Sequence, residues 1–293
     1  MEAGPRTGFV GGGPHRLYFR DVGEGPPIVV LHGGPDFDHE YLVPEMDRLA
    51  ESFRLVYYDQ RGRGRSFEGP GPVEVTMESE VEDLDRVRTW FGFDSVVVLG
   101  HSWGCLLALE YAIRHSARVS GLILMNGVPA DHADVPALRA EMARRRTPGQ
   151  TDRMAALRAD PNFAAGDIET EAEYYRLHYG TTLRDPELLD AVVGRLRTAF
   201  TPEGVLMARA IEERLYEHTW ARPDYDLIPA LRRLDVPTLI LHGDDDFVPL
   251  DLVRRIADAM PQARLVVLPD CGHFVYLEQS ERSATAVTEF LGR

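Results

Sequence analysis

The chain has 293 residues, of which 44% are hydrophobic, and it carries a formal net charge of −15. A chain of this length can bury one large core, or a core with a smaller added layer. So acidic a balance argues against nucleic acid and against an anionic membrane surface as partners, because like charges repel. Two cysteines, Cys105 and Cys271, are too few for a disulfide framework.

No apolar stretch of the sequence approaches the ~20 residues that a membrane-spanning helix needs. The N-terminal residues also lack the apolar segment of a signal peptide. A soluble protein of the cytoplasm is therefore expected.

Six short runs of β-branched and aliphatic residues are predicted to be strands. Each run is almost wholly apolar, which is typical of strands buried on both faces of a parallel sheet. A further run at 15–23 predicts an outer strand, which can be antiparallel. Each of the six ends in Gly, Asp, Asn or His, so polar groups are expected at the carboxyl ends of the strands, where open parallel sheets bind ligands. The six runs begin at Pro27, Phe53, Ser95, Ser120, Pro237 and Ala263.

Amphipathic stretches with helical spacing alternate with these runs, for example at 76–92, 105–116 and 280–293. This alternation predicts an α/β fold with a mostly parallel central sheet and helices on both of its faces. Residues 1–127 and 226–293 are expected to form this core.

The segment 128–225 contains no convincing buried strand and is predicted to be a helical insertion. We interpret it as a cap, or lid, over the carboxyl ends of the strands, because binding pockets favour domain junctions. A helical mass elsewhere on the surface is the alternative.

The segment Gly100-His101-Ser102-Trp103-Gly104 joins a predicted buried strand to an apolar helix without a spacer. The pattern G-x-S-x-G alone is weak evidence, but this strand–turn–helix context is that of a nucleophilic serine held in a sharp turn. Gly100 and Gly104 keep the positions small where strand and helix converge. The backbone N–H of Trp103, at the start of the helix, can then stabilise an oxyanion. A phosphate-binding loop is the alternative, but the segment lacks both lysine and the P-loop pattern.

A serine nucleophile needs a base, and the base needs an acid that orients it. Among the ten histidines, His273 is the candidate base, because it follows the last predicted strand in a short loop before the final helix. His101 is adjacent to Ser102, where neighbouring side chains diverge. His32 and His242 also end strands, but turn packing is enough to explain them.

Three adjacent aspartates, Asp244, Asp245 and Asp246, follow the penultimate predicted strand and compete for the role of the acid. After the first of the six strands, the turn His32-Gly33-Gly34-Pro35 allows a backbone N–H to approach a ligand closely. Gly34 is therefore the candidate for a second oxyanion donor beside Trp103, and an ordinary turn is the alternative.

The motifs HGGP, DQRGRGRS, GHSWG, HGDDDFVP and CGHFVYLE follow one another in this order. Together they resemble those of the α/β-hydrolases and, within them, of the proline iminopeptidase family of serine peptidases. The resemblance covers about residues 10–127 and 226–293 and is weaker in between. It implies Ser102 as nucleophile, His273 as base and Asp246 as acid, since the family's acid stands three residues after the glycine of HGxxD. The order Ser, Asp, His along the chain is also typical of α/β-hydrolases.

The sequence departs from the family at two positions. Asp36 replaces the last glycine of the family's HGGPG. Its side chain is either a solvated acid or an element of substrate specificity. Family members that remove N-terminal proline bind the free amine with glutamates, one of which follows the catalytic aspartate in some members; here that residue is Phe247. Glu212, Glu213 and Glu217 are candidate amine partners, or a solvated helix face. Because a buried amine without a partner is costly, a pocket without such a glutamate fits a neutral ester, lactone or amide better.

The expected function is therefore that of a serine hydrolase that forms an acyl-enzyme, foremost a proline iminopeptidase-like aminopeptidase. A carboxylesterase, lactonase or amidase is the second expectation. The expected substrate is a small molecule or a short peptide, and no metal or cofactor is implied, since metal-binding spacings such as H-E-x-x-H are absent.

Other activities share this fold. Dehalogenases and epoxide hydrolases carry an aspartate at the position of Ser102, which makes them poor matches. A haloperoxidase-like side reaction uses the same triad. A non-catalytic ligand-binding protein is a further alternative, because fold does not determine function.

Overall fold

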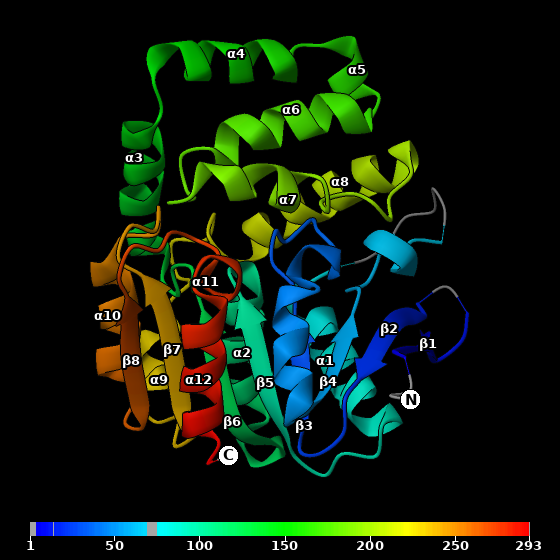
Figure 1. Ribbon diagram of the computed structural model, residues 1–293, viewed down its shortest axis with the longest axis vertical. Helices are drawn as coiled ribbons and strands as arrows, with labels where there is room; N and C mark the ends of the chain where they lie inside the picture. Colours follow the sequence, from blue (N-terminus) through cyan, green and yellow to red (C-terminus); the bar gives the residue numbers. More distant parts are fainter. Residues whose placement is uncertain (1–3, 14, 69–74, 293) are drawn as a thin grey trace.

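The computed structural model describes residues 4–13, 15–68 and 75–292. At its centre is one eight-stranded sheet with strand order β1-β2-β4-β3-β5-β6-β7-β8 (Figure 1). The pairs β1–β2 and β2–β4 are antiparallel, and all other pairs are parallel. The strands are β1 (Arg6–Val10), β2 (Leu17–Val22), β3 (Pro27–Leu31), β4 (Arg54–Tyr58), β5 (Val96–His101), β6 (Val119–Met125), β7 (Thr238–Gly243) and β8 (Ala263–Leu268).

The predicted α/β fold is confirmed, and the six predicted runs are β3 to β8. The predicted outer strand is β2, which is antiparallel to its neighbours. Strand β1 was not predicted, because its residues are mostly exposed or half-buried and form no continuous apolar run.

The α-helices are α1 (Met77–Trp90), α2 (Trp103–Arg114), α3 (Val135–Arg145), α4 (Pro148–Arg158), α5 (Pro161–Ala164), α6 (Ile168–Tyr179), α7 (Leu189–Val193), α8 (Pro202–His218), α9 (Ile228–Leu231), α10 (Leu250–Ala259), α11 (Val275–Glu278) and α12 (Ser280–Phe290). Short 3-10 helices are η1 (Glu40–Leu42), η2 (Glu45–Glu51), η3 (Gly64–Ser66), η4 (Ser116–Arg118), η5 (His132–Asp134) and η6 (Pro186–Leu188). Among the residues that the structure describes, no helix combines the length and the apolar character needed to cross a membrane.

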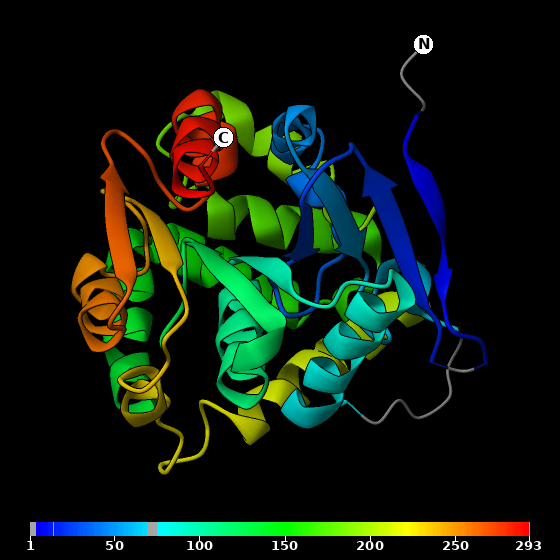
Figure 2. The same cartoon turned by 90° about the horizontal axis from the view of Figure 1, so that it is seen from below.

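Both faces of the sheet are buried under helices (Figure 2). Successive side chains of a strand point to opposite faces, and β3 shows the consequence. Its Val29 and Leu31 join the core shared with α1, α2 and α10, whereas Ile28 and Val30 join the core shared with η2, α11 and α12. The apolar run of β3 therefore reflects burial on both sides.

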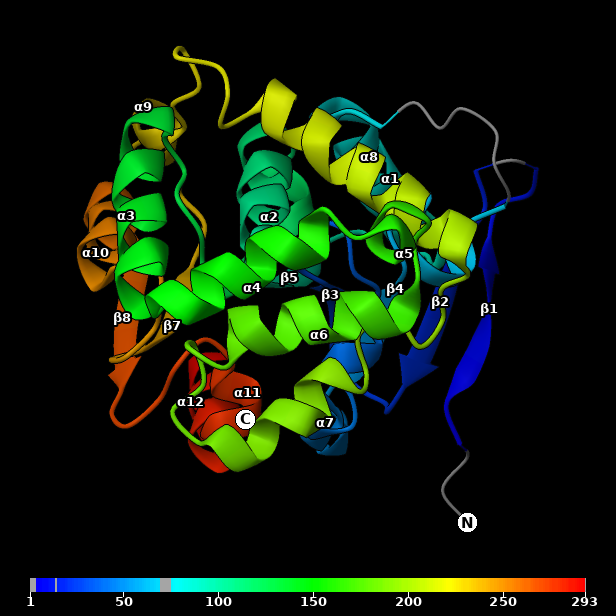
Figure 3. The ribbon, with the colours of Figure 1, turned by 90° about the horizontal axis from the view of Figure 1, so that it is seen from above.

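Residues 128–225 contain the helices α3 to α8 and no strand. These helices lie above the end of the sheet at which the parallel strands finish (Figures 1 and 3). Aromatic packing joins them to the core, because the Trp103 ring lies 5.1 Å from Trp220 and 5.4 Å from Tyr216, measured between ring centroids. The boundaries at 128 and 225 stay a prediction.

Helix α8 begins where Thr201 caps it, with the Gly204 N–H donating to Thr201 Oγ1 at 3.2 Å and Pro202 in the first turn. Both features favour a helix start. The helix buries one face, formed by Gly204, Val205, Ala208, Ile211 and Leu215. Glu212 directly follows Ile211, which belongs to this buried face. Successive residues of an α-helix are turned by about 100°, so Glu217 points about 140° away from Glu212 around the helix axis.

Candidate active site

Ser102 stands between the end of β5 and the start of α2, with φ 54° and ψ −120°. A non-glycine residue with positive φ is strained and persists only where its surroundings enforce it. A Cβ on Gly100 would lie 2.3 Å from the Gly104 carbonyl oxygen, and a Cβ on Gly104 would lie 2.4 Å from that of Leu31. The two glycines thus let strand and helix come close enough to hold the serine in the turn.

The structure brings Ser102, His273 and Asp246 into one line of hydrogen bonds. His273 Nε2 lies 3.0 Å from Ser102 Oγ, and His273 Nδ1 lies 2.8 Å from Asp246 Oδ1. These residues come from loops after β5, β8 and β7, so the topology collects them at one edge of the sheet. Of the three competing aspartates, Asp244 is exposed and accepts a hydrogen bond from the Cys271 N–H, while Asp245 pairs with Arg145.

Asp246 is buried and fully hydrogen-bonded. The Asn126 side-chain amide donates to Asp246 Oδ2 at 2.8 Å, and the Val248 N–H donates to Oδ1 at 3.0 Å. Burial acts to raise the pKa of Asp246, but His273, His242 and these hydrogen bonds outweigh it and hold the pKa below its usual range. The carboxylate is therefore ionised at neutral pH and can orient the imidazole of His273.

His101 links the HGGP turn to the His273 loop. Tyr41 accepts from the Gly33 N–H at 2.8 Å, so its own proton is free to donate to His101 Nδ1, also at 2.8 Å. His101 Nε2 then donates to the His273 carbonyl at 2.9 Å. Burial, with the nearby His273, lowers the pKa of His101 to about 3, so this ring stays neutral and serves as a brace.

The two expected oxyanion donors, Gly34 and Trp103, line the same cavity as Ser102. The N–H of Gly33 is used by Tyr41, which leaves Gly34 as the next amide of that turn. Gly34 has φ 114°, and a Cβ there would lie 2.3 Å from the Asp36 nitrogen, so only glycine fits. Trp103 is the first residue of α2, where backbone N–H groups lack partners within the helix.

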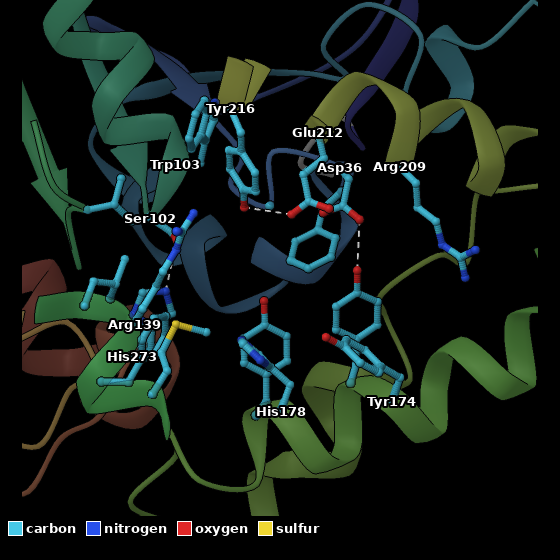
Figure 4. Close-up of a pocket in the computed structure, with 18 of the residues that line it drawn as sticks. Asp36, Ser102, Trp103, Arg139, Tyr174, His178, Arg209, Glu212, Tyr216 and His273 are labelled. Atoms are coloured by element: carbon cyan, nitrogen blue, oxygen red, sulfur yellow. Dashed lines mark hydrogen bonds between the residues drawn. The ribbon is translucent and has the colours of Figure 1, made fainter. Parts of the chain in front are cut away.

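A cavity of about 630 Å³ lies between the core and helices α3 to α6 and α8 (Figure 4). This volume is in the range of small-molecule sites. The charged residues, histidines and serine that line it are Asp36, Ser102, Arg139, Arg146, Arg158, Glu171, His178, Arg209, Glu212, Glu213 and His273.

Asp36 is 2% exposed, so it is not a solvated acid. Its carboxylate forms an ion pair with Arg197 and accepts from the Tyr175 hydroxyl at 2.9 Å. Arg197 also donates to Glu171 at 2.9 Å, and Glu171 accepts from Arg209 at 2.6 Å. The four charges alternate in sign, so Asp36 is neutralised by an arginine from residues 128–225.

Glu212 faces the cavity and differs from Asp36, because no arginine of the described residues pairs with it directly. It accepts from the Tyr216 hydroxyl at 2.7 Å. Burial and the negative charge of Asp36 raise the pKa of Glu212 to about 8. Glu212 is therefore mostly protonated at pH 7, and a cationic group bound beside it would favour its ionised form.

The other expected substrate-binding residues have different positions. Glu213 lines the cavity but is largely exposed. The expectation for Glu217 is wrong, because this residue is exposed and lies outside the cavity lining, on another side of α8. Phe247 is buried, with its ring centroid 4.3 Å from that of His273, so it forms an apolar wall there.

Sequence reasoning missed several residues of this site. Asn126 directly follows β6 in the run LILMN, and a polar side chain at that strand end is the signal that could have pointed to it. Arg145 donates to the Asp245 carbonyl at 2.8 Å and to that of Asp246 at 2.9 Å, which ties α3 to the acid loop. Nothing in the local sequence marks Arg145 or Arg197 for these contacts. Cys105 and Cys271 are buried free thiols.

The fold and this site define the class of the protein. Residues 26–280 match the model of the family described as alpha/beta hydrolase fold, and the chain belongs to this family of hydrolases.

The chain is similar to proline iminopeptidases, as its motifs suggested. It is 28% identical to the proline iminopeptidase of Saccharolobus solfataricus over 94% of this chain and 88% of that protein. Its structure resembles that of a proline iminopeptidase from Mycobacterium smegmatis, with 25% identity, a TM-score of 0.69 and coverage of 98% and 97% of the two chains. It also resembles a thermophilic esterase from Thermogutta terrifontis, with 26% identity, a TM-score of 0.71 and coverage of 99% and 98%.

Proposed function

We propose that the protein is a serine hydrolase that acts by acyl transfer, with aminopeptidase activity on substrates that carry a free N-terminal amine. The assignment as a serine hydrolase rests on the hydrogen bonds that connect Asp246, His273 and Ser102 at the wall of the cavity. The substrate is a small molecule or a short peptide, because the cavity holds about 630 Å³.

In this mechanism Ser102 Oγ attacks the substrate carbonyl while His273 Nε2 takes its proton. The backbone N–H groups of Gly34 and Trp103 stabilise the resulting oxyanion. His273 then returns the proton to the leaving group, and water repeats the sequence on the acyl-enzyme. Asp246 holds the ring of His273 in the required orientation and stabilises its cationic form.

The amine preference rests on Glu212. Asp36 and Glu171 are already paired with arginines, so Glu212 is the cavity acid left to bind a substrate ammonium group, which would favour the ionised form of Glu212. In Figure 4 Glu212 lies across the cavity from Ser102, so a substrate amine at Glu212 and a carbonyl at Ser102 would occupy different sides of the cavity. A neutral ester, lactone or amide is the second candidate. Protonated Glu212 would favour it, since a pKa of about 8 leaves this group mostly uncharged at pH 7.

A substrate panel separates the two candidates. We expect proline arylamide to be hydrolysed faster than N-acetylproline arylamide, and Glu212→Gln to lower kcat/KM for the free-amine substrate about 30-fold or more, the scale for a buried charge left unpaired. Activity on an aryl acetate should stay within a few-fold, since that substrate has no amine. Glu217→Gln, in the same helix but exposed, is the matched control. Equal losses on all three substrates, or no loss, would contradict amine recognition by Glu212.

The same assignment predicts a pH dependence. An ammonium substrate binds the ionised form of Glu212, and the ionised fraction falls about tenfold per pH unit below a pKa of about 8. KM for proline arylamide should therefore rise more than about tenfold as the pH drops from 8 to 6. KM for an aryl acetate should not follow this trend, and Glu212→Gln should remove it. Parallel trends for both substrates in the wild type would count against Glu212.

A further inference from the structure

The cavity carries positive charge that its own acids do not neutralise. Arg209, in its lining, pairs with Glu171. Arg139, Arg146 and Arg158 also line the cavity, yet none of them pairs with a carboxylate within the described part of the chain. Arg158 donates to the hydroxyl of Tyr174. Arg139 and Arg158 are exposed, whereas Arg146 is half-buried, so a cation without an anionic partner is most costly at Arg146.

Arg146 is the most enclosed of the three. Its Nη2 lies 2.7 Å from His178 Nδ1, and its Nε is buried without a hydrogen-bond partner in the described structure. A guanidinium only donates, so His178 accepts at Nδ1 and carries its proton on Nε2. Burial and the charge of Arg146 lower the pKa of His178 to about 3, so the His178 ring is neutral at pH 7. Arg146 and His178 together can donate N–H hydrogen bonds to a ligand and carry one positive charge. Neither has a free acceptor atom, because His178 Nδ1 already accepts from Arg146.

This group lies on the side of the cavity that the leaving group would occupy. Phe247 packs between two histidines, its ring centroid being 4.3 Å from that of His273 and 5.9 Å from that of His178. Arg139 lies on the Ser102 and His273 side of the cavity in Figure 4, away from Glu212. Because His273 protonates the leaving group, that group has to sit on the His273 side, next to these cations.

We propose that Arg139, Arg146 and His178 form a subsite for a carboxylate on the leaving group. This inference rests on the proposed hydrolase function and deepens it, since it names the substrate class. The preferred peptide is then a dipeptide, with its ammonium group at Glu212, its scissile carbonyl at Ser102 and its α-carboxylate at the arginines. Guanidinium groups bind carboxylates through paired, charge-assisted hydrogen bonds, and His178 Nε2–H adds a further donor. Arg158 adds positive charge behind this subsite.

Two substrate pairs test the subsite. The first is prolyl-glycine against prolyl-glycinamide. The second is 4-acetoxybenzoate against its methyl ester, whose phenolic leaving groups differ in charge and which need no amine. Wild-type kcat/KM should favour the carboxylate member of each pair about 10- to 100-fold, the scale of one charge-assisted interaction. Arg146→Ala and Arg139→Ala should each remove most of this preference, measured as the ratio within each pair.

Arg144→Ala is the matched control, because this exposed neighbour pairs with Glu141, lies outside the cavity lining and should keep the full preference. Arg139 is itself exposed, so its variant tests the subsite even if Arg146→Ala folds poorly. Unchanged ratios in the variants, together with normal ester turnover, would overturn the subsite and leave the hydrolase function standing. A preference for 4-acetoxybenzoate over its methyl ester, with no turnover of prolyl-glycine or prolyl-glycinamide, would support the subsite and overturn the aminopeptidase assignment.

Discussion

Ser102→Ala is expected to lower kcat by about 10⁶-fold, because the serine, histidine and acid act as a unit and the loss of the nucleophile removes the whole covalent route. The measurement is kcat on an aryl acetate and on proline arylamide, with purified variant at high enzyme concentration. The fold should survive, since alanine at φ 54° meets the same backbone strain as serine.

Ser95→Ala is the matched control for this variant. Ser95 is exposed and lies in the loop before β5, at the far end of the strand from Ser102. Its removal should leave kcat unchanged. Turnover of the Ser102 variant close to that of the wild type would show that the hydrogen-bonded line is not the nucleophilic machinery.

Arg197→Met is expected to destabilise the protein by about 3–5 kcal/mol, the cost of leaving a buried charge without its partner. Arg197 and the carboxylates of Asp36 and Glu171 are each at most 3% exposed, so water cannot replace the lost cation. The measurement is urea-induced unfolding, with the midpoint compared at equal slope.

Arg195→Met is the control for this prediction. Its ion pair with Glu45 is partly exposed on both sides, at 28% and 20%, so its removal should cost less than about 1 kcal/mol. Equal effects of the two variants would mean that Asp36 and Glu171 are not held by Arg197. Loss of Arg197 should also weaken the contact between α6 and the turn around Asp36, since Tyr175 shares that carboxylate.

The sequence predicts those parts of the fold whose side chains share one environment over several consecutive residues. Strands β3 to β7 are almost wholly buried, and this leaves nearly continuous apolar runs. Strand β8 lies at the edge of the sheet and is mostly half-buried, but it is also rich in apolar residues. Strand β1 lies at the exposed edge of the sheet and leaves no such run. Helices are visible where an apolar face recurs, as in α1.

The residues of the candidate site likewise divide into those that local sequence can locate and those that it cannot. Ser102 and His273 could be located because each stands in a local context, a turn between strand and helix or a short loop after a strand. The choice among Asp244, Asp245 and Asp246 needed the resemblance to a family, because three adjacent carboxylates have the same local chemistry. The structure separates them by burial and by which one reaches His273.

The substrate-binding residues were the least predictable. Glu212 and Glu217 occupy one charged helix, and only the packing of that helix on the core decides which one enters the cavity. Asp36 meets a partner, Arg197, that is 161 positions away in the sequence, and no local pattern records this contact. Such long-range charge pairing depends on the placement of residues 128–225 above the sheet.

The central claim, that Ser102 is an activated nucleophile, is tested most directly by covalent labelling with a fluorophosphonate and peptide mapping. Cleavage after arginine places Ser102 in the peptide Thr89–Arg114, which also contains Ser95, so fragmentation has to distinguish the two serines. We predict a single adduct on Ser102, formed rapidly by the wild type and lost in His273→Ala. No adduct, or one on a residue other than Ser102, would contradict this claim.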